Sequence, residues 1–91
     1  MLQPSYTKRF EKDLKLMLRR GKAEKRIRDV MSQLIRQEPL EPKHRDHMLL
    51  GNWKGRRDCH IEADWVLIYQ VNETARRILF ERTGTHSDLF R

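Results

Sequence analysis

Residues 57–71 read RDCHIEADWVLIYQV, and this stretch decides which fold the chain can form. Polar and apolar side chains alternate over residues 56–61, as they do in a strand with one buried face. Residues 65–71 are apolar on both faces, with Gln70 as the exception, which is typical of a central strand. Alternation returns over residues 76–82, after a turn at residues 72–74. The second half of the chain therefore predicts a small, mostly antiparallel sheet.

The first half has the residue spacing of helices. Residues 2–6 fit a short edge strand, because Pro4 cannot donate a hydrogen bond to a neighbouring strand, and Thr7 can cap a following helix. Apolar side chains then form two helical stripes that are separated by Gly21: Phe10, Leu14, Met17 and Leu18, then Ala23, Ile27, Val30, Met31, Leu34 and Ile35. We expect an α+β fold in which an N-terminal helical hairpin packs on the sheet. Residues 1–91 are too few for two cores, so we expect a single domain.

The positive charge is concentrated on the predicted hairpin. Residues 8–28 hold ten basic and three acidic side chains, and so carry the whole formal net charge of +7. A basic surface of this density attracts polyanions, and nucleic acid is the first candidate partner. A solvated helix face that only aids solubility is the alternative interpretation. The side chains expected to contact RNA are Lys8, Lys12, Lys15, Arg19, Arg20, Lys22, Lys25 and Arg26.

Several classes of protein do not fit this sequence. The longest apolar run, residues 65–69, has five residues, whereas a membrane helix needs about 20. We see no secretory signal, and the single Cys59 has no partner for an intrachain disulfide, so we expect a cytoplasmic protein that does not engage a membrane. The sequence contains neither a glycine-rich phosphate loop nor a nucleophile elbow, which argues against a nucleotide enzyme and a serine hydrolase.

All four histidines lie in the second half, at positions 44, 47, 60 and 86. Histidine can act as a general acid or base near neutral pH. Asp58 and His60 share one face of their predicted strand, because side chains alternate with period two. Asp64 opens the next strand, and Arg82 ends the last one shortly before His86. We therefore expect His60, Asp64, Arg82 and His86 to meet on one surface of the sheet.

These residue types could also suggest zinc, with His44, His47, Cys59 and His60 as ligands. Cys59 and His60 are neighbours on a strand and point to opposite faces, so they cannot easily share a metal. We expect no metal and no cofactor. Metal-free cleavage of RNA fits better, because RNA carries its own nucleophile in the 2′-hydroxyl. The protein then supplies only a base, an acid and a cation for the phosphate.

Three motifs resemble those of a known family: residues 46–60 (DHMLLGNWKGRRDCH), 62–69 (EADWVLIY) and 80–90 (FERTGTHSDLF). They are similar to the YafQ-type toxins of the RelE/ParE superfamily, which belong to bacterial type II toxin–antitoxin systems. The resemblance implies a RelE-like, microbial ribonuclease-like fold. It also implies a ribosome-dependent endoribonuclease that cuts mRNA and stops translation, and an antitoxin encoded beside the toxin.

The resemblance carries functional positions over to His47, His60, Asp64, Trp65, His86 and Phe90 and, from the wider superfamily, to Arg82. We expect Asp64 or His60 to take the 2′-hydroxyl proton and His86 to protonate the leaving oxygen. His47 and Arg82 would stabilise charge on the phosphate, and Trp65 and Phe90 would position bases or the C-terminal tail. Packing is the alternative role for Trp65, because an aromatic residue at the start of a strand is usually part of the core. Asp64 can act as a base only if its surroundings raise its pKa above the ordinary value of about 3.9. Trp53 is expected in the core.

The expected partners are thus mRNA, the ribosome and a cognate antitoxin, with the basic hairpin docked on ribosomal RNA. Two other functions stay open at this point. A ParE-like inhibitor of DNA gyrase could use the same fold, although it would not need the set of histidines. A non-catalytic RNA- or ribosome-binding module would retain all its activity when His86 is replaced by Gln.

Overall fold

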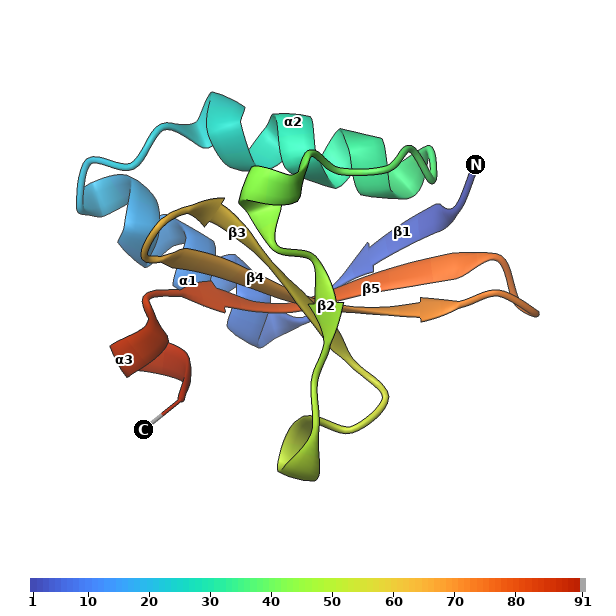
Figure 1. The fold of residues 1–91 in the computed structure, drawn as a ribbon. Coiled ribbons are helices and arrows are strands. Elements are labelled where there is room, and N and C mark those ends of the chain that lie inside the picture. Colours follow the sequence, from blue (N-terminus) through green and yellow to red (C-terminus); the bar gives the residue numbers. More distant parts are fainter. Residues whose placement is uncertain (91) are drawn as a thin grey trace.

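The computed structural model describes residues 1–90, which form one five-stranded sheet with helices on both faces (Figure 1). The strands are β1 (Gln3–Tyr6), β2 (His47–Met48), β3 (Arg57–Glu62), β4 (Trp65–Asn72) and β5 (Arg77–Gly84). The helices are α1 (Lys8–Arg19), α2 (Glu24–Ile35) and α3 (His86–Leu89), with short 3-10 turns η1 (Pro42–His44) and η2 (Gly51–Trp53). The predicted α+β fold is confirmed.

The strand order is β1-β5-β4-β3-β2. β1 pairs with β5 in parallel, and the other pairs are antiparallel. The apolar strand β4 lies in the middle, as its sequence predicts, and the Pro4-containing β1 lies at an edge. The region between the hairpin and β3 also contains a two-residue strand, β2, which the sequence analysis did not predict. This strand is too short to leave a periodic signal in the sequence.

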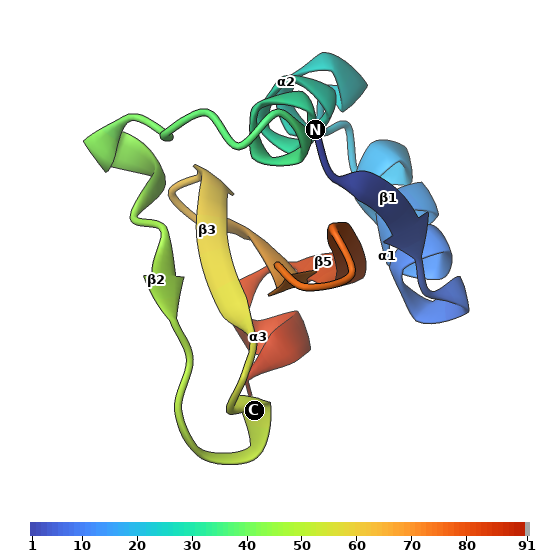
Figure 2. The ribbon, with the colours of Figure 1, turned by 90° about the vertical axis from the view of Figure 1, so that its right-hand side faces the viewer.

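The helical hairpin covers one face of the sheet (Figure 2). Thr7 caps α1, because its Oγ1 accepts a hydrogen bond of 2.9 Å from the Phe10 backbone N–H. Both predicted stripes face inward, and their buried members are joined by side chains from the strands. The buried residues of this core are Leu2, Phe10, Met17, Ile27, Val30, Leu34, Cys59, Ile61, Trp65, Leu67, Tyr69, Ile78 and Phe80. The hairpin thus leaves the opposite face of the sheet for other contacts.

Helix α3 packs against that opposite face. Leu89 contacts Val66 and Ile68 there, and the half-buried Trp53 packs on the same small cluster rather than in the main core. Gly84 permits this approach, because a Cβ at that position would lie 3.0 Å from the Cβ of Asp88. The sequence analysis predicts no helix in this part of the chain. The capping box between Thr85 and Asp88 explains why a single helical turn forms there.

Within residues 1–90, none of the helices combines the length and the apolar character that crossing a membrane requires.

Candidate active site

The strand register gathers polar side chains on the face of the sheet that carries α3. Asp58 lies between His47 of β2 and Ile68 of β4. His60 lies opposite Val66, which in turn lies opposite Gly84. Because residues paired across strands share a face, these two rows place His47, Asp58 and His60 beside the start of α3.

His60, Asp64 and His86 meet at this place. The ring centroids of His60 and His86 lie 5.1 Å apart. Asp64 Oδ1 lies 2.8 Å from His86 Nδ1, and the same oxygen accepts a 3.0 Å hydrogen bond from the His86 backbone N–H. The predicted convergence of these three residues is therefore confirmed, and it depends on the turn between β3 and β4 meeting the first residue of α3.

The contacts of Asp64 indicate that it orients His86. The backbone N–H and the ring of His86 lower the pKa of Asp64 below its ordinary value. The condition under which Asp64 could serve as a base, a raised pKa, is thus not met in this structure. A carboxylate bound to Nδ1 fixes the direction of the imidazole and leaves Nε2 available for proton transfer. His60 remains as the candidate base.

Asp58 is a member of the site that the sequence analysis did not select. Its side chain is buried, and its Oδ1 has no hydrogen-bond partner within residues 1–90. Burial raises the pKa of Asp58, and the neighbouring His47, His60 and His86 oppose that rise. A buried carboxylate that faces three imidazoles is unusual. The shared strand face of Asp58 and His60 was the signal that could have identified it.

His47 lies at the edge of this cluster. Its Nδ1 is 2.6 Å from the Arg45 carbonyl oxygen, which accepts the ring proton, and 3.2 Å from Asp58 Oδ1. Because the ring proton points to the carbonyl, the approach to Asp58 is an electrostatic contact and not an aligned hydrogen bond. His47 is exposed, so it is accessible to a ligand from solvent.

Helix α3 is held in place by a clamp from α1. Asp88 Oδ2 accepts a 2.8 Å hydrogen bond from Arg20 and a 3.0 Å hydrogen bond from the Thr85 backbone. Arg20, followed by Thr85, lowers the pKa of Asp88 to about 2. Arg20 therefore belongs to the support of His86, which the prediction of an RNA-binding role did not anticipate.

Phe90 ends the same segment beside the site. It is 37% exposed, and its ring centroid lies 6.1 Å from that of His86 and 6.2 Å from that of Trp53. A partly exposed ring at this position is accessible to a planar ligand, and its role in positioning bases or the tail stays a prediction.

Two predicted site residues, Trp65 and Arg82, do not present a free side chain to the candidate site in this structure. Trp65 is fully buried in the main core, where its Nε1 donates a 2.9 Å hydrogen bond to Thr83, so in this structure it packs in the core and offers no surface that a base could contact. Arg82 is also not the end of its strand, which continues to Gly84. Register places it opposite Ile68, on the side of the site. Its guanidinium instead turns to Asp13 of α1, with contacts of 2.7 and 3.2 Å.

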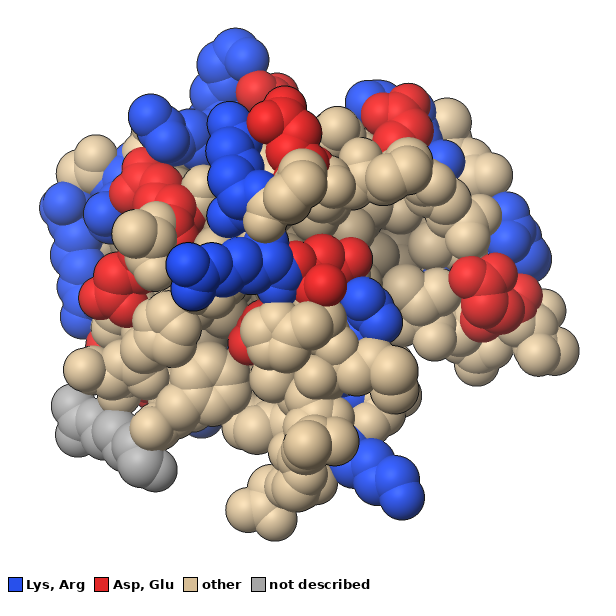
Figure 3. Space-filling view, viewed as in Figure 1, with Lys and Arg blue, Asp and Glu red and all other residues tan. Residues whose placement is uncertain are grey.

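The basic hairpin divides into two sets of cations. Figure 3 shows Lys and Arg gathered at the upper left of the molecule, over the hairpin. Arg20, Lys22, Lys25 and Arg26 make ion pairs with Asp88, Glu62, Asp29 and Glu62, respectively. Within the hairpin, residues 8–28, the exposed cations that make no ion pair all lie on α1, and they include Lys8, Lys12, Lys15 and Arg19.

The donor set was also tested for metal binding. Across residues 1–90, no three His, Cys, Asp or Glu side chains are grouped so that they could hold a metal ion. Cys59 is buried in the main core, and His44 Nδ1 is engaged by the His60 carbonyl oxygen at 2.6 Å.

Comparisons with known proteins identify the class. The family described as "Bacterial toxin of type II toxin-antitoxin system, YafQ" matches residues 2–91. The "mRNA interferase toxin YafQ" of Escherichia coli K12 is 44% identical over 86 residues, which cover 93% of this chain and 91% of the relative.

Two solved structures share the fold. A metal-bound toxin from Helicobacter pylori has a TM-score of 0.93 at 38% identity, covering 99% of this chain and 100% of the other. YafQ in the E. coli DinJ–YafQ toxin–antitoxin complex has a TM-score of 0.90 at 41% identity, covering 99% and 98%. The fold and the site are thus those of a toxin of the type II toxin–antitoxin systems. Within that class, the chain belongs to the YafQ family.

Proposed function

We propose that this toxin is an endoribonuclease that cleaves mRNA on the ribosome by metal-free general acid–base catalysis. The observation that carries the proposal is the His60–His86–Asp64 cluster, in which two imidazoles lie 5.1 Å apart and one is oriented by a carboxylate. The name of the E. coli relative, an mRNA interferase, supports the substrate class.

The reaction follows from the chemistry of RNA. His60 takes the proton of the 2′-hydroxyl, and the 2′-oxygen attacks the adjacent phosphorus. The bond from phosphorus to the 5′-oxygen then breaks, and the protonated His86 gives its Nε2 proton to that oxygen. The products are a 2′,3′-cyclic phosphate and a free 5′-hydroxyl. Asp64 holds the ring of His86, Asp58 and His47 provide further charge, and Phe90 stacks on a base.

Docking on ribosomal RNA is assigned to α1. Its unpaired cations form an exposed row beside the Arg20–Asp88 clamp, which leads directly to the helix that carries His86. Counterion release from such a surface favours the binding of a polyanion independently of its nucleotide sequence. Because the catalytic face itself offers few free cations, affinity for mRNA would depend on the ribosome. A cognate antitoxin would neutralise the toxin, as DinJ is found in complex with YafQ.

The test is a toeprint of mRNA on programmed ribosomes. Wild-type protein is expected to cut in the presence of EDTA, and His86→Gln is expected to bind ribosomes without cutting. Lys54→Gln is the matched control, since Lys54 is exposed in the loop before β3 and makes no side-chain contact with the histidines in residues 1–90. Cleavage by His86→Gln at the wild-type rate would support a non-catalytic role for the histidine. Loss of wild-type cleavage in EDTA would show that a metal is required.

A further inference from the structure

The geometry points to Arg45 as the cation that binds the phosphodiester being cleaved. This inference rests on the proposed function and names a residue for the charge-stabilising step, which Arg82 was expected to perform. The sequence analysis did not select Arg45 as a site residue.

The other arginines around the site are engaged by carboxylates. Arg82 binds Asp13, Arg56 binds Glu81 at 2.7 Å, and Arg57 lies 3.4 Å from Asp46. Moving any of these guanidinium groups to a phosphate would leave its carboxylate without the cation that now neutralises it. A free cation for the reaction must therefore come from another position.

Arg45 meets that requirement. It is exposed, and its guanidinium makes no hydrogen bond or ion pair with another residue in 1–90. Its backbone has a φ of 46°, in the left-handed region where non-glycine residues are uncommon and cluster at functional sites. Its carbonyl oxygen also accepts the ring proton of His47, so the backbone of Arg45 is tied to a residue of the site.

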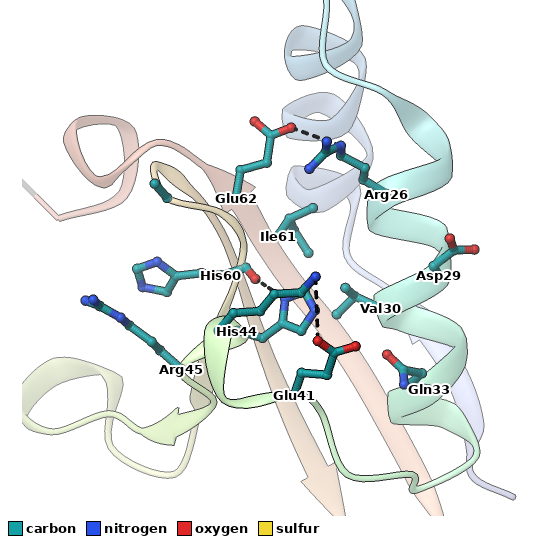
Figure 4. Close-up of a pocket in the computed structure, with 12 residues that line it drawn as sticks. Arg26, Asp29, Val30, Gln33, Glu41, His44, Arg45, His60, Ile61 and Glu62 are labelled. Atoms are coloured by element: carbon teal, nitrogen blue, oxygen red, sulfur yellow. Dashed lines mark hydrogen bonds and ion pairs between the residues drawn. The ribbon is translucent and has the colours of Figure 1, made fainter.

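Arg45 and His60 line one groove of about 750 Å³ between α2, the η1 turn and β3. Figure 4 shows both side chains projecting in the same direction, away from α2. His44 joins the two backbones, since its Nδ1 lies 2.6 Å from the His60 carbonyl oxygen. The proposal places the guanidinium of Arg45 against a phosphate that lies beside the His60 ring, on the side toward which both side chains project.

The chemistry suits this side chain. The pentacoordinate phosphorus carries more negative charge on its oxygens than the diester does, and a guanidinium can bind two of those oxygens through parallel N–H donors. Asp58 and Asp64 add negative charge near the reacting group, which makes a facing cation more necessary. The stabilisation is largest at the transition state, so it should act on the rate of cleavage rather than on ribosome binding.

Arg45→Gln and Lys43→Gln provide the test. Lys43 is the matched control, because it lies in the same turn and lines the same groove, but its ammonium pairs with Glu41 at 3.6 Å. Single-turnover cleavage is measured on programmed ribosomes at saturating toxin. We expect Arg45→Gln to be about 100-fold slower than wild type, Arg45→Lys to be intermediate, and Lys43→Gln to stay within about threefold of wild type.

The possible failures can be told apart. An Arg45→Gln rate close to that of Lys43→Gln would overturn the role of Arg45 and leave the proposed function standing. A wild-type protein that does not cleave mRNA would overturn both. Circular dichroism melts of the three variants check folding, and Arg45→Gln should melt with wild type because the guanidinium is exposed and makes no hydrogen bond or ion pair within residues 1–90. A large loss of melting temperature in Arg45→Gln would instead assign Arg45 a structural role.

Discussion

Replacing Trp65 with Phe tests whether Trp65 stabilises the core by packing or contacts the substrate. The indole has no exposed surface, and its Nε1 donates to Thr83 Oγ1. The substitution removes roughly 40 Å³ of side chain, and at about 24 cal/mol per Å³ the cavity costs about 1 kcal/mol. Loss of the buried hydrogen bond costs about 1 kcal/mol more. The Thr83 hydroxyl keeps its own 2.8 Å bond to the Val66 carbonyl oxygen, so no further loss is expected there.

The sum of about 2 kcal/mol corresponds to a fall of roughly 8–16 °C in the melting temperature of a domain of this size. Thermal unfolding by circular dichroism measures it, and cleavage is compared well below both melting temperatures. Per folded molecule, we expect Trp65→Phe to cleave within about threefold of wild type. Phe90→Leu, which removes a partly exposed ring, should keep a melting temperature near that of wild type and cleave more slowly. A Trp65→Phe protein with wild-type stability and lost activity would refute the packing role.

Three further predictions concern charge. Burial raises the pKa of Asp58 above its unfolded value, so its native charge lowers stability as the pH rises through that raised pKa. Asp58→Asn should therefore increase the unfolding free energy at pH 8 by more than at pH 3, where the carboxyl is protonated in the folded chain as well as in the unfolded one; an equal difference in denaturant melts at both pH values would contradict this. Arg20→Gln breaks a pair that is 42% and 26% exposed and that solvent therefore screens, so it should reduce cleavage far more than stability. Lys25→Gln, which breaks an exposed pair within α2, is its control. Replacing Lys8, Lys12, Lys15 and Arg19 with Gln should reduce the slope of log affinity for ribosomes against log salt by roughly three, and filter binding that gives an unchanged slope would place docking elsewhere.

Local patterns in the sequence predict most of the fold. The continuous apolar run identifies β4 as the central strand, and helical spacing together with Thr7 predicts α1. The short elements β2 and α3 were not predicted, because two and four residues are too few to establish a period in the sequence. The sequence does contain the capping box at Thr85 and Asp88, which could have indicated α3.

The part of the site that depends on local patterns could be predicted from the sequence, and the part that depends on long-range contacts could not. Alternation places Asp58 and His60 on one face, and the short turn before β4 brings Asp64 to His86. The partner of Arg82 could not be anticipated, because Asp13 lies 69 residues earlier in the chain. A bulge in β5 also breaks the alternation between Phe80 and Arg82, so these two residues lie on opposite faces. Such contacts are fixed by tertiary packing.

The most direct test of the proposed chemistry removes the nucleophile from the substrate. An mRNA with one 2′-deoxynucleotide on the 5′ side of the cleaved bond is placed on ribosomes, and cleavage by the wild-type toxin is mapped by primer extension. If His60 activates the 2′-hydroxyl, cutting at that bond stops while other sites in the same message are still cut. Cutting at the modified bond at an undiminished rate would contradict the mechanism.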